Sequence, residues 1–211
     1  MPEISRLNRD SDWIELDFVE REETPRELMK LGIHLHVAGL SLSDTISILD
    51  KFGVKRSRST VHNWIQKAGL QPTDGKNPDH VAVDETVIQI NDQRYWLYAA
   101  VDPQSKKYLH VRLFSSRTRA LTEIFLSELR DKHQVDDAIF LVDGAPWLHA
   151  ALRRHGLRFR HETHGNRNAA ERLFKELKRR TYQFANHFRN ADPATAETWL
   201  QTTAFIENHS I

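Results

Sequence analysis

Three consecutive segments in the middle of the chain constrain the fold more than any other feature. They are residues 80–90, 94–101 and 108–114. All three are rich in the β-branched and aromatic residues that are typical of strands. Turn-forming residues separate them, first at Asn91-Asp92 and then at 102–105. Because strands joined by such tight turns pair as antiparallel neighbours, the chain is expected to contain a three-stranded antiparallel meander here.

Helical and strand patterns alternate after the meander. The predicted elements are a helix at 119–131, a strand at 138–142, a helix at 146–155, a strand at 157–161 and a long helix from Asn168. The fourth strand follows a helix, so it must re-enter the sheet by a crossover. Its unbroken apolar run suits a strand buried on both faces, as parallel strands are. We therefore expect an α/β fold with a mixed five-stranded sheet flanked by helices, in which the first and fourth strands can be neighbours.

The first third of the chain reads as helical. Amphipathic patterns cover residues 25–40, 41–53 and 56–67. A short helix, a turn and a polar-faced helix form the helix-turn-helix pattern, whose second helix enters the DNA major groove. The polar face of the third helix carries Arg58, Asn63 and Gln66, which are candidate base readers. Three-helix arrangements also occur in proteins that never touch DNA, and this alternative stays open.

A cluster of turn-forming residues at 71–79 marks the clearest boundary in the chain. The predicted organisation is an acidic N-terminal arm at 1–24, a small all-α helix-turn-helix region at 25–70, a linker at 71–79, an α/β domain at 80–185 and a C-terminal helical segment at 186–211. Disorder and a role in dimerisation are both open for the acidic arm.

The charges are segregated although the net charge is only +1. No acid occurs from Lys51 to Lys67, and bases dominate residues 153–180, where Lys175, Lys178 and Arg179 lie. Clustered bases on a nearly neutral protein point to a polyanionic partner. A solvated helix face is the alternative explanation.

Several classes of protein are excluded or disfavoured. The absence of cysteine excludes disulfides and thiolate zinc sites. No stretch approaches the ~18 apolar residues of a membrane span, and the N-terminus lacks the apolar segment of a signal peptide. We expect a soluble cytoplasmic protein without a membrane partner.

Three acids occupy special positions in this arrangement. Asp84 follows Val81-Ala82-Val83 on the first strand, Asp143 ends the fourth strand, and Glu171 lies in the last basic helix. Ligands of open α/β sheets bind beyond the carboxyl ends of the strands. Carboxylates gathered there would repel one another unless cations were present, and Mg²⁺ prefers such oxygen ligands. Two Mg²⁺ ions about 3.5–4 Å apart can support an in-line displacement at phosphorus.

Each acid also has a simpler explanation. Asp143 could cap the helix that follows it, and Glu85 competes with Asp84 for the role on the first strand. Glu171 could pair with Lys175 at the i+4 position, which stabilises a helix by only about 0.2–0.5 kcal/mol. The joint placement of the three acids therefore carries the argument.

At these residues the chain resembles a known family. The order of a helix-turn-helix, Val83-Asp84-Glu85-Thr86, Val142-Asp143-Gly144 and a basic helix with glutamate resembles the DDE transposases of bacterial and archaeal insertion sequences. Within them it looks closest to the insertion sequence six family. The resemblance implies a ribonuclease-H-like catalytic domain at 80–185, with Asp84, Asp143 and Glu171 as catalytic metal ligands.

The most specific match surrounds the glutamate. Many such transposases carry Tyr-x2-Arg-x3-Glu-x6-Lys, and this chain has Arg167, Glu171 and Lys178 at that spacing. It departs from the pattern with His164 at the tyrosine position and with a shorter gap between Asp143 and Glu171. The resemblance implies that Arg167 and Lys178 contact DNA, and Lys175 and Arg179 are expected to hold phosphates beside them.

The function implied by the resemblance is that of a DNA transposase. It would bind the terminal inverted repeats of an insertion sequence, cleave a strand there and join it to target DNA, using two Mg²⁺ ions for which Mn²⁺ is expected to substitute. A homodimer or higher oligomer is expected because two DNA ends must be joined. The expected location is the prokaryotic cytoplasm, at the nucleoid.

Two alternatives remain beside this interpretation. One is a stand-alone ribonuclease-H-like nuclease, which has little use for a helix-turn-helix. The other is a non-catalytic helix-turn-helix DNA-binding protein derived from a transposase, against which the three acids argue. The inverted-repeat sequence, the target preference and the choice between replicative and cut-and-paste routes are not encoded in any pattern we identify.

Overall fold

The computed structural model describes residues 13–18, 24–162, 167–183, 188 and 190–209. Within the helix at 167–183, the side chains from Glu171 to Arg180 are described. The elements in chain order are α2 (Arg26–Val37), α3 (Leu42–Lys51), α4 (Arg58–Ala68), β1 (His80–Ile90), β2 (Gln93–Asp102), β3 (Lys107–Phe114), α5 (Arg119–Lys132), β4 (Ile139–Val142), α6 (Pro146–Arg154), β5 (Arg158–His161), α7 (Arg167–Gln183) and α8 (Pro193–Glu207).

The N-terminal region consists of α2, α3 and α4, so the three expected helices are confirmed. Ser41 and Ser57 cap α3 and α4 by accepting hydrogen bonds from the backbone N–H groups of Asp44 and Thr60. The apolar side of α4 is buried against the other two helices, with Trp64 at the centre of the contact. That these helices bind DNA remains a prediction.

The sheet has the strand order β3-β2-β1-β4-β5. β2 is antiparallel to both β1 and β3, whereas β4 is parallel to β1 and β5 is parallel to β4. The meander, the crossover into β4 and the neighbouring positions of β1 and β4 are therefore confirmed. β4 is buried among apolar residues, in agreement with its unbroken apolar sequence.

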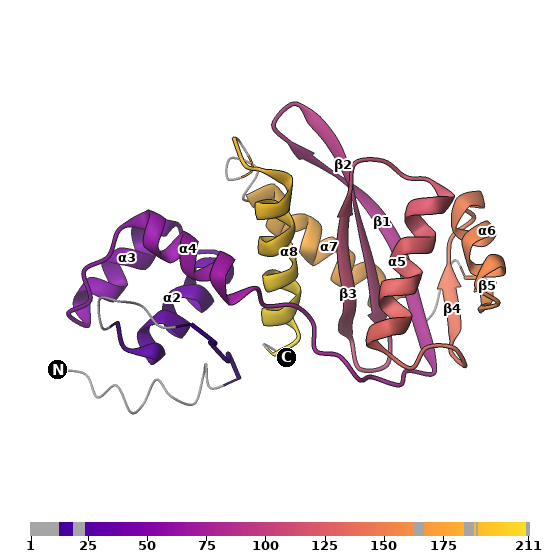
Figure 1. Cartoon of the computed structure of the whole chain (residues 1–211), viewed down its shortest axis with the longest axis horizontal. Helices are drawn as coiled ribbons and strands as arrows, with labels where there is room; N and C mark the ends of the chain where they lie inside the picture. The colour runs from indigo at the N-terminus through magenta and orange to yellow at the C-terminus, as the bar shows by residue number, and fades with distance from the viewer. Residues whose placement is uncertain (1–12, 19–23, 163–166, 184–187, 189, 210–211) are drawn as a thin grey trace.

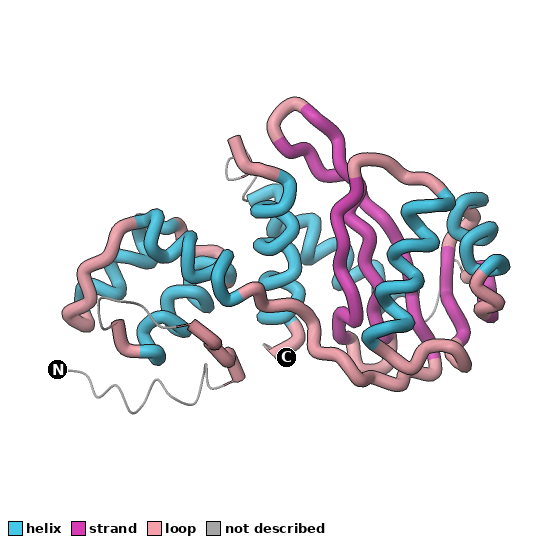
Figure 2. Tube along the Cα trace, in the orientation of Figure 1, coloured by secondary structure: helices cyan, strands magenta, loops and turns pink. Residues whose placement is uncertain are grey.

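Helices cover both faces of the sheet (Figures 1 and 2). α5 and α6 pack on one face, where Phe125 and Leu148 belong to a core shared with Val83. α7 and α8 pack on the other face, where Leu177 and Leu200 share a core with Ala82. The mixed five-stranded sheet flanked by helices is thus the observed fold. Among the described helices, none is both long enough and apolar enough to cross a membrane.

α8 connects the sheet to the N-terminal helices. It packs on β3 and also contacts α4 and α2, and the core on this face continues into the helical region. Arg180 of α7 reinforces the connection, because it donates a hydrogen bond to the carbonyl of Ala38 after α2 and pairs with Glu207 of α8 at 3.1 Å. The expected linker at 71–79 contains no helix or strand. α8 packs against both the sheet and the N-terminal helices.

Part of the acidic arm packs on its own chain. Ile14 and Leu16 are buried, and Trp13 stacks on His209 with the ring centroids 4.5 Å apart. Residues 13–18 are therefore packed on the fold, and a role of the arm in dimerisation stays a prediction. The rest of the arm lies outside the described residues.

Candidate active site

The register between β1 and β4 places two predicted acids side by side. The last paired residues are Ala82 and Leu141, and Asp84 and Asp143 each follow two positions later. Because parallel strands advance together by about 3.3 Å per residue, the two aspartates lie at the same level, Asp84 within β1 and Asp143 just after β4. Both side chains are half-buried. The sheet therefore brings Asp84 and Asp143 together at its carboxyl edge, as expected.

The pleat of the strands decides which face each acid occupies. Ala82 and Leu141 belong to the core under α7 and α8, and residues two positions apart in a strand share a face. Asp84 and Asp143 thus face the side covered by α7. Glu85 follows the alternation of Val81 and Val83, which belong to the core under α5 and α6. The competing acid is therefore directed to the opposite face of the sheet.

Backbone hydrogen bonds orient both aspartates. Asp84 Oδ1 accepts the N–H of Glu85 at 2.9 Å, and Asp143 Oδ1 accepts the N–H of Ala145 at 3.0 Å, which closes a turn after β4. His149 Nε2 holds the same turn through the carbonyl of Asp143 at 2.7 Å. The N-cap residue of α6 is Ala145, which has no side-chain cap. The alternative that Asp143 caps this helix is therefore wrong.

Glu171 is placed on the helix that covers this face. α7 packs on β1 and β2 through Leu173 and Leu177, and Tyr108 in β3 donates a hydrogen bond to the carbonyl of Leu173 at 2.6 Å. Glu171 itself is exposed. Among the described residues, no three acidic or histidine side chains lie close enough to hold a metal ion together. The structure thus brings the two aspartates together and leaves Glu171 on the neighbouring helix.

Glu176, the other acid of α7, has a different set of contacts. It accepts hydrogen bonds from Arg179 at 2.5 Å and from Arg180 at 3.1 Å, and the bond from Arg179 is the main reason that its pKa lies below the usual range. These contacts lie on the side of α7 that faces α8 and Glu207. Glu176 is therefore held by two arginines of its own helix. Arg179 is 51% exposed in its pair with Glu176, and its expected contact with phosphates stays a prediction.

Glu85, at the same edge of the sheet, has a strongly raised pKa. Only 7% of its side chain is exposed. Burial, followed by the charges of Asp84 and Asp143, raises its pKa to about 7, while Arg117 and Trp147 oppose the rise. Glu85 Oε2 and the indole Nε1 of Trp147 are both buried without a partner in hydrogen-bond geometry. An acid with this pKa is partly protonated near neutral pH.

Sequence reasoning missed two residues beside Glu85. Arg117 lies in the loop between β3 and α5, with Nη1 3.8 Å from Glu85 Oε1. Its guanidinium lies over the ring of Trp147 in α6, 4.6 Å from the centroid. Only their positions in the sequence could have indicated them: Arg117 follows the end of a strand, and Trp147 lies in the helix that follows Asp143. Neither has a motif of its own.

The predicted base readers differ in their surroundings. Arg58 and Asn63 are exposed on α4. Gln66 donates its side-chain amide to the carbonyl of Thr195 in α8, at 3.3 Å. Its position at the contact between α4 and α8 disfavours the expected role in reading bases, whereas Arg58 and Asn63 are compatible with it.

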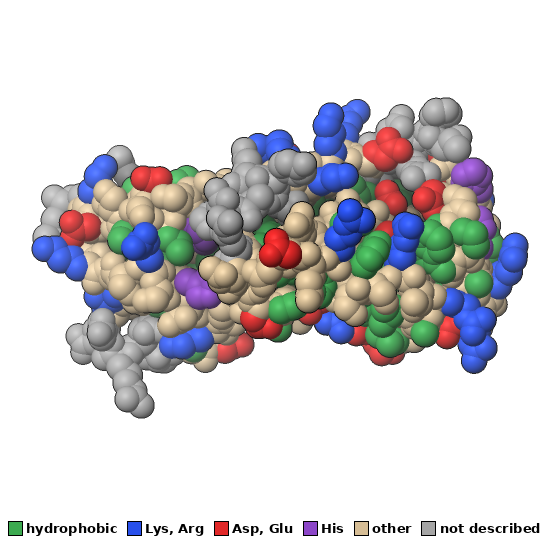
Figure 3. All heavy atoms as spheres, turned by 90° about the horizontal axis from the view of Figure 1, so that it is seen from above, with side chains coloured by type: hydrophobic (Ala, Val, Ile, Leu, Met, Phe, Trp, Pro, Cys, Tyr) green, Lys and Arg blue, Asp and Glu red, His purple; other side chains and the backbone are tan. Residues whose placement is uncertain are grey.

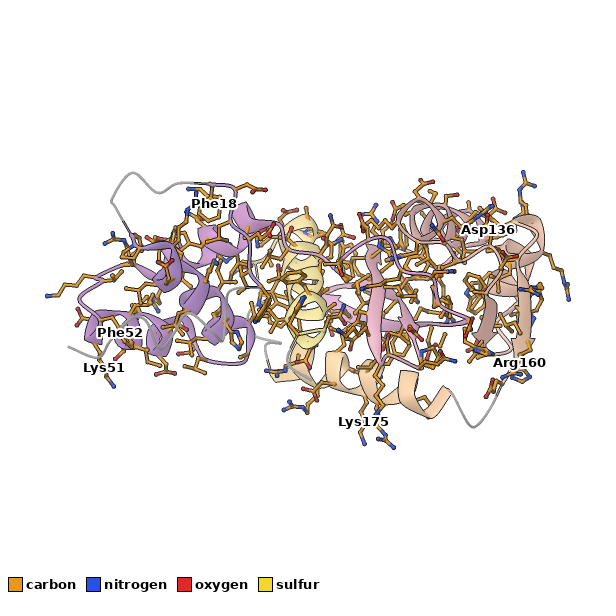
Figure 4. The ribbon with its side chains drawn as sticks, turned by 90° about the horizontal axis from the view of Figure 1, so that it is seen from below. Phe18, Lys51, Phe52, Asp136, Arg160 and Lys175 are labelled. Carbon is orange, nitrogen blue, oxygen red and sulfur yellow. The ribbon has the colours of Figure 1, made fainter. Side chains whose placement is uncertain are left out.

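The predicted DNA contacts on α7 are mostly on its outer side. Lys175 and Lys178 are exposed, and Figure 4 shows Lys175 pointing away from the sheet. Arg167 begins α7, but its side chain lies outside the described residues, as does His164. Figure 3 views the molecule from the carboxyl edge of β1 and β4 and shows acidic and basic side chains exposed together.

The chain is similar to several known proteins. An uncharacterized protein of Methanocaldococcus jannaschii, MJ0017, is 28% identical over 197 residues, which cover 92% of both chains. The solved structures that resemble the fold include the catalytic core domain of BIV integrase, with 14% identity, coverage of 58% of this chain and 82% of that chain, and a TM-score of 0.43. The HTLV-2 integrase catalytic core domain in complex with magnesium has 14% identity, coverage of 60% and 85%, and a TM-score of 0.45.

The strand order and directions are those of the ribonuclease-H-like fold that the resemblance implied. A family model described as a DDE domain matches residues 79–210, which include the whole sheet, α7 and α8. This match covers more than half of the chain, and it contains Asp84, Asp143 and Glu171. The chain therefore belongs to the DDE domain family.

Proposed function

We propose that this protein is a metal-dependent DNA transposase, which cleaves a strand at the end of an insertion sequence and joins it to target DNA. The observation that carries the proposal is the shared level of Asp84 and Asp143 on two adjacent parallel strands. Both lie on the face covered by the helix that bears Glu171, in a chain of the DDE domain family.

The residues at the edge suit divalent metal ions. Asp84 and Asp143 offer hard carboxylate oxygens, which Mg²⁺ and Mn²⁺ accept as ligands. Backbone N–H groups fix one oxygen of each carboxylate. Glu171 is proposed as the third ligand, carried by α7. The chemistry that two such ions supply when bound is activation of the attacking oxygen and stabilisation of the leaving one.

The proposed reaction has two displacements at phosphorus. Attack by water on a phosphodiester frees a 3′-hydroxyl at the end of the element, and that hydroxyl then attacks a phosphodiester of target DNA. Each step forms one phosphorus–oxygen bond and breaks another, so no further reactant is required. The role of the protein is to hold both strands at the same edge of the sheet.

The surrounding bases would hold the DNA. Lys178 lies two helical turns beyond Glu171 on the same side of α7, and Lys175 extends from its outer surface. Phosphate contacts of this kind weaken as the salt concentration rises. Arg58 and Asn63 on the exposed side of α4 are the proposed readers of the inverted repeat. Because two ends must be joined, the working unit is proposed to be a homodimer or a higher oligomer in a prokaryotic cytoplasm.

The test is strand transfer by the purified protein on a pre-nicked element end. We expect joined product with Mg²⁺ or Mn²⁺, none with EDTA, and none for Asp84→Asn. Tight binding of the end without joining under any condition would instead identify a non-catalytic DNA-binding protein. Metal-dependent cleavage of DNA with no preference for the inverted repeat, and no joining, would identify a stand-alone nuclease.

A further inference from the structure

The loop before α5 lies at the same edge of the sheet as the two aspartates. β3 and β1 are both antiparallel to β2, so they run in the same direction, and Phe114 at the end of β3 is level with Val87 of β1. The chain then turns through residues 115–118 into α5, whose N-cap is Thr118. Arg117 of this loop reaches back to Glu85, the residue after Asp84.

Two side chains orient Arg117 without enclosing it. Trp147 supports one face of the guanidinium, and Glu85 attracts it from 3.8 Å, a distance too long for a hydrogen bond. The guanidinium carbon lies over the Trp147 ring, and arginine carries five N–H donors around that carbon. The side chain is 49% exposed, compared with 7% for Glu85. A residue that served only to neutralise Glu85 would not need this exposure.

Neighbouring arginines differ from Arg117 in their carboxylate partners. Arg119 and Arg154 both pair with Glu123, at 3.2 Å and 3.5 Å. Arg130, near the other end of α5, donates a hydrogen bond from Nε to Asp136 at 2.7 Å. The side chains of Glu123 and Asp136 are 22% and 66% exposed, whereas the partner of Arg117 is an acid at the active edge that is only 7% exposed.

The edge also needs a fixed cation if it is to hold DNA. Asp84 and Asp143 are both close enough to affect the ionisation of Glu85, so negative charge is concentrated there. A DNA phosphate would be repelled by these groups. The helices α5 and α6 both begin at this edge, and neither has an acidic residue in its first turn. The positive ends of their helix dipoles therefore add positive potential beside Arg117.

We infer that Arg117 is a DNA-binding residue that holds a backbone phosphate of the strand lying along the active edge. Its planar guanidinium suits bidentate recognition of a phosphate. It would contact the strand from the α5 and α6 side, while Lys178 contacts DNA from α7, so the strand is held from both faces of the sheet. The inference rests on the proposed function, because it takes DNA as the substrate of this edge.

The test compares Arg117→Gln and Arg117→Lys with Arg130→Gln, which removes the same charge near the far end of α5. Affinity for a fluorescent pre-nicked DNA end is measured in EDTA across a series of salt concentrations. We expect Arg117→Gln to weaken binding by about 5–30-fold at low salt and to reduce the slope of log affinity against log salt by about 1. Arg117→Lys is expected to keep the slope and lose affinity only several-fold, and Arg130→Gln to match the wild type within about twofold.

A second variant guards against misfolding. Arg117→Gln leaves Glu85 without its counter-charge, so the double variant Arg117→Gln/Glu85→Gln is measured beside it, with thermal unfolding as the folding control. Unchanged affinity and slope in the folded double variant would overturn the inference.

Because these measurements need no catalysis, they separate the two proposals. A wild-type protein that binds but never joins DNA would refute the transposase while leaving the Arg117 result valid, and one that never binds DNA would refute both.

Discussion

The two faces of the sheet differ at the edge where their acids lie. On the α7 side, Asp84 and Asp143 are half-buried and oriented by backbone N–H groups. On the α5 and α6 side, Glu85 is buried beside the half-exposed Arg117 and has a raised pKa. Asp84 and Glu85 are consecutive in the sequence, yet the pleat gives them different neighbours and, we propose, different roles.

The faces also differ in what lies behind them. The core under α5 and α6 is confined to the sheet and those helices. The core under α7 and α8 continues into the N-terminal helices, and Arg180 links α7 to the end of α2. The helix that carries Glu171 is therefore packed into the layer that supports the proposed DNA-reading helix. The face with the proposed catalytic acids is therefore also the one connected to the N-terminal helices.

The largest expected effect distinguishes Asp84 from Glu85. Asp84→Asn and Asp143→Asn should each lower strand transfer by about 10³-fold or more, equivalent to ~4 kcal/mol of transition-state stabilisation. Glu85→Gln should retain activity within about tenfold, because Glu85 lies on the other face. Single-turnover strand transfer measures all three, with DNA binding in EDTA as the control. Loss of activity in Glu85→Gln with full activity in Asp84→Asn would reverse the assignment of the faces.

The next effect compares the two acids of α7. Glu171→Gln should reduce strand transfer by about 10²–10³-fold, or roughly 3–4 kcal/mol, if α7 brings this carboxylate to the metal ions. Glu176→Gln should keep activity within about threefold and lower the free energy of unfolding by about 1 kcal/mol, because it loses its bonds to Arg179 and Arg180. Full activity in Glu171→Gln would remove Glu171 from the proposed site.

A third prediction concerns the stability of the α5 and α6 side. The folded-state pKa of Glu85 is about 7, above its ordinary value of 4.5. The folded protein therefore retains this proton more strongly, and the associated stability is present below about pH 4.5 and is lost as the pH rises through 7. Glu85→Gln, which stays neutral, should raise the free energy of unfolding at pH 8 by up to about 3 kcal/mol.

Urea unfolding of the wild type and Glu85→Gln at several pH values measures this difference. The gain should shrink as the pH falls and vanish below about pH 4.5, where both side chains are neutral. A gain of equal size at every pH would show that packing of the amide, and not ionisation, is responsible.

The smallest effect concerns the helix α4. Asn63→Ala should weaken binding to the inverted repeat by about 5–30-fold, or 1–2 kcal/mol, and should have less effect on a scrambled sequence. Gln66→Ala should change this preference less, because its amide is bonded to Thr195. Fluorescence anisotropy with both DNA sequences distinguishes the two variants. A larger loss of sequence preference in Gln66→Ala would mean that α4 separates from α8 when it binds DNA.

Much of the architecture could be predicted from local patterns. β1 begins and ends at the predicted residues, and the apolar run before Asp143 is a buried parallel strand, as expected. The positions of Asp84 on the first strand and of Asp143 at the end of the fourth were sufficient to nominate them. Arg117 could not be nominated in this way, because its surroundings come from β1 and α6, which are remote in sequence.

The sequence by itself determined the order of helices and strands and, to within a few residues, where they begin and end. This is possible because hydrophobic periodicity and turn chemistry depend on residues that are close together in the chain. Only the tertiary structure decided that Asp84 and Asp143 share a level, that Glu85 is buried beside Arg117, and that Gln66 is held against α8. Strand register and helix docking set these relations, and both depend on contacts between residues far apart in sequence.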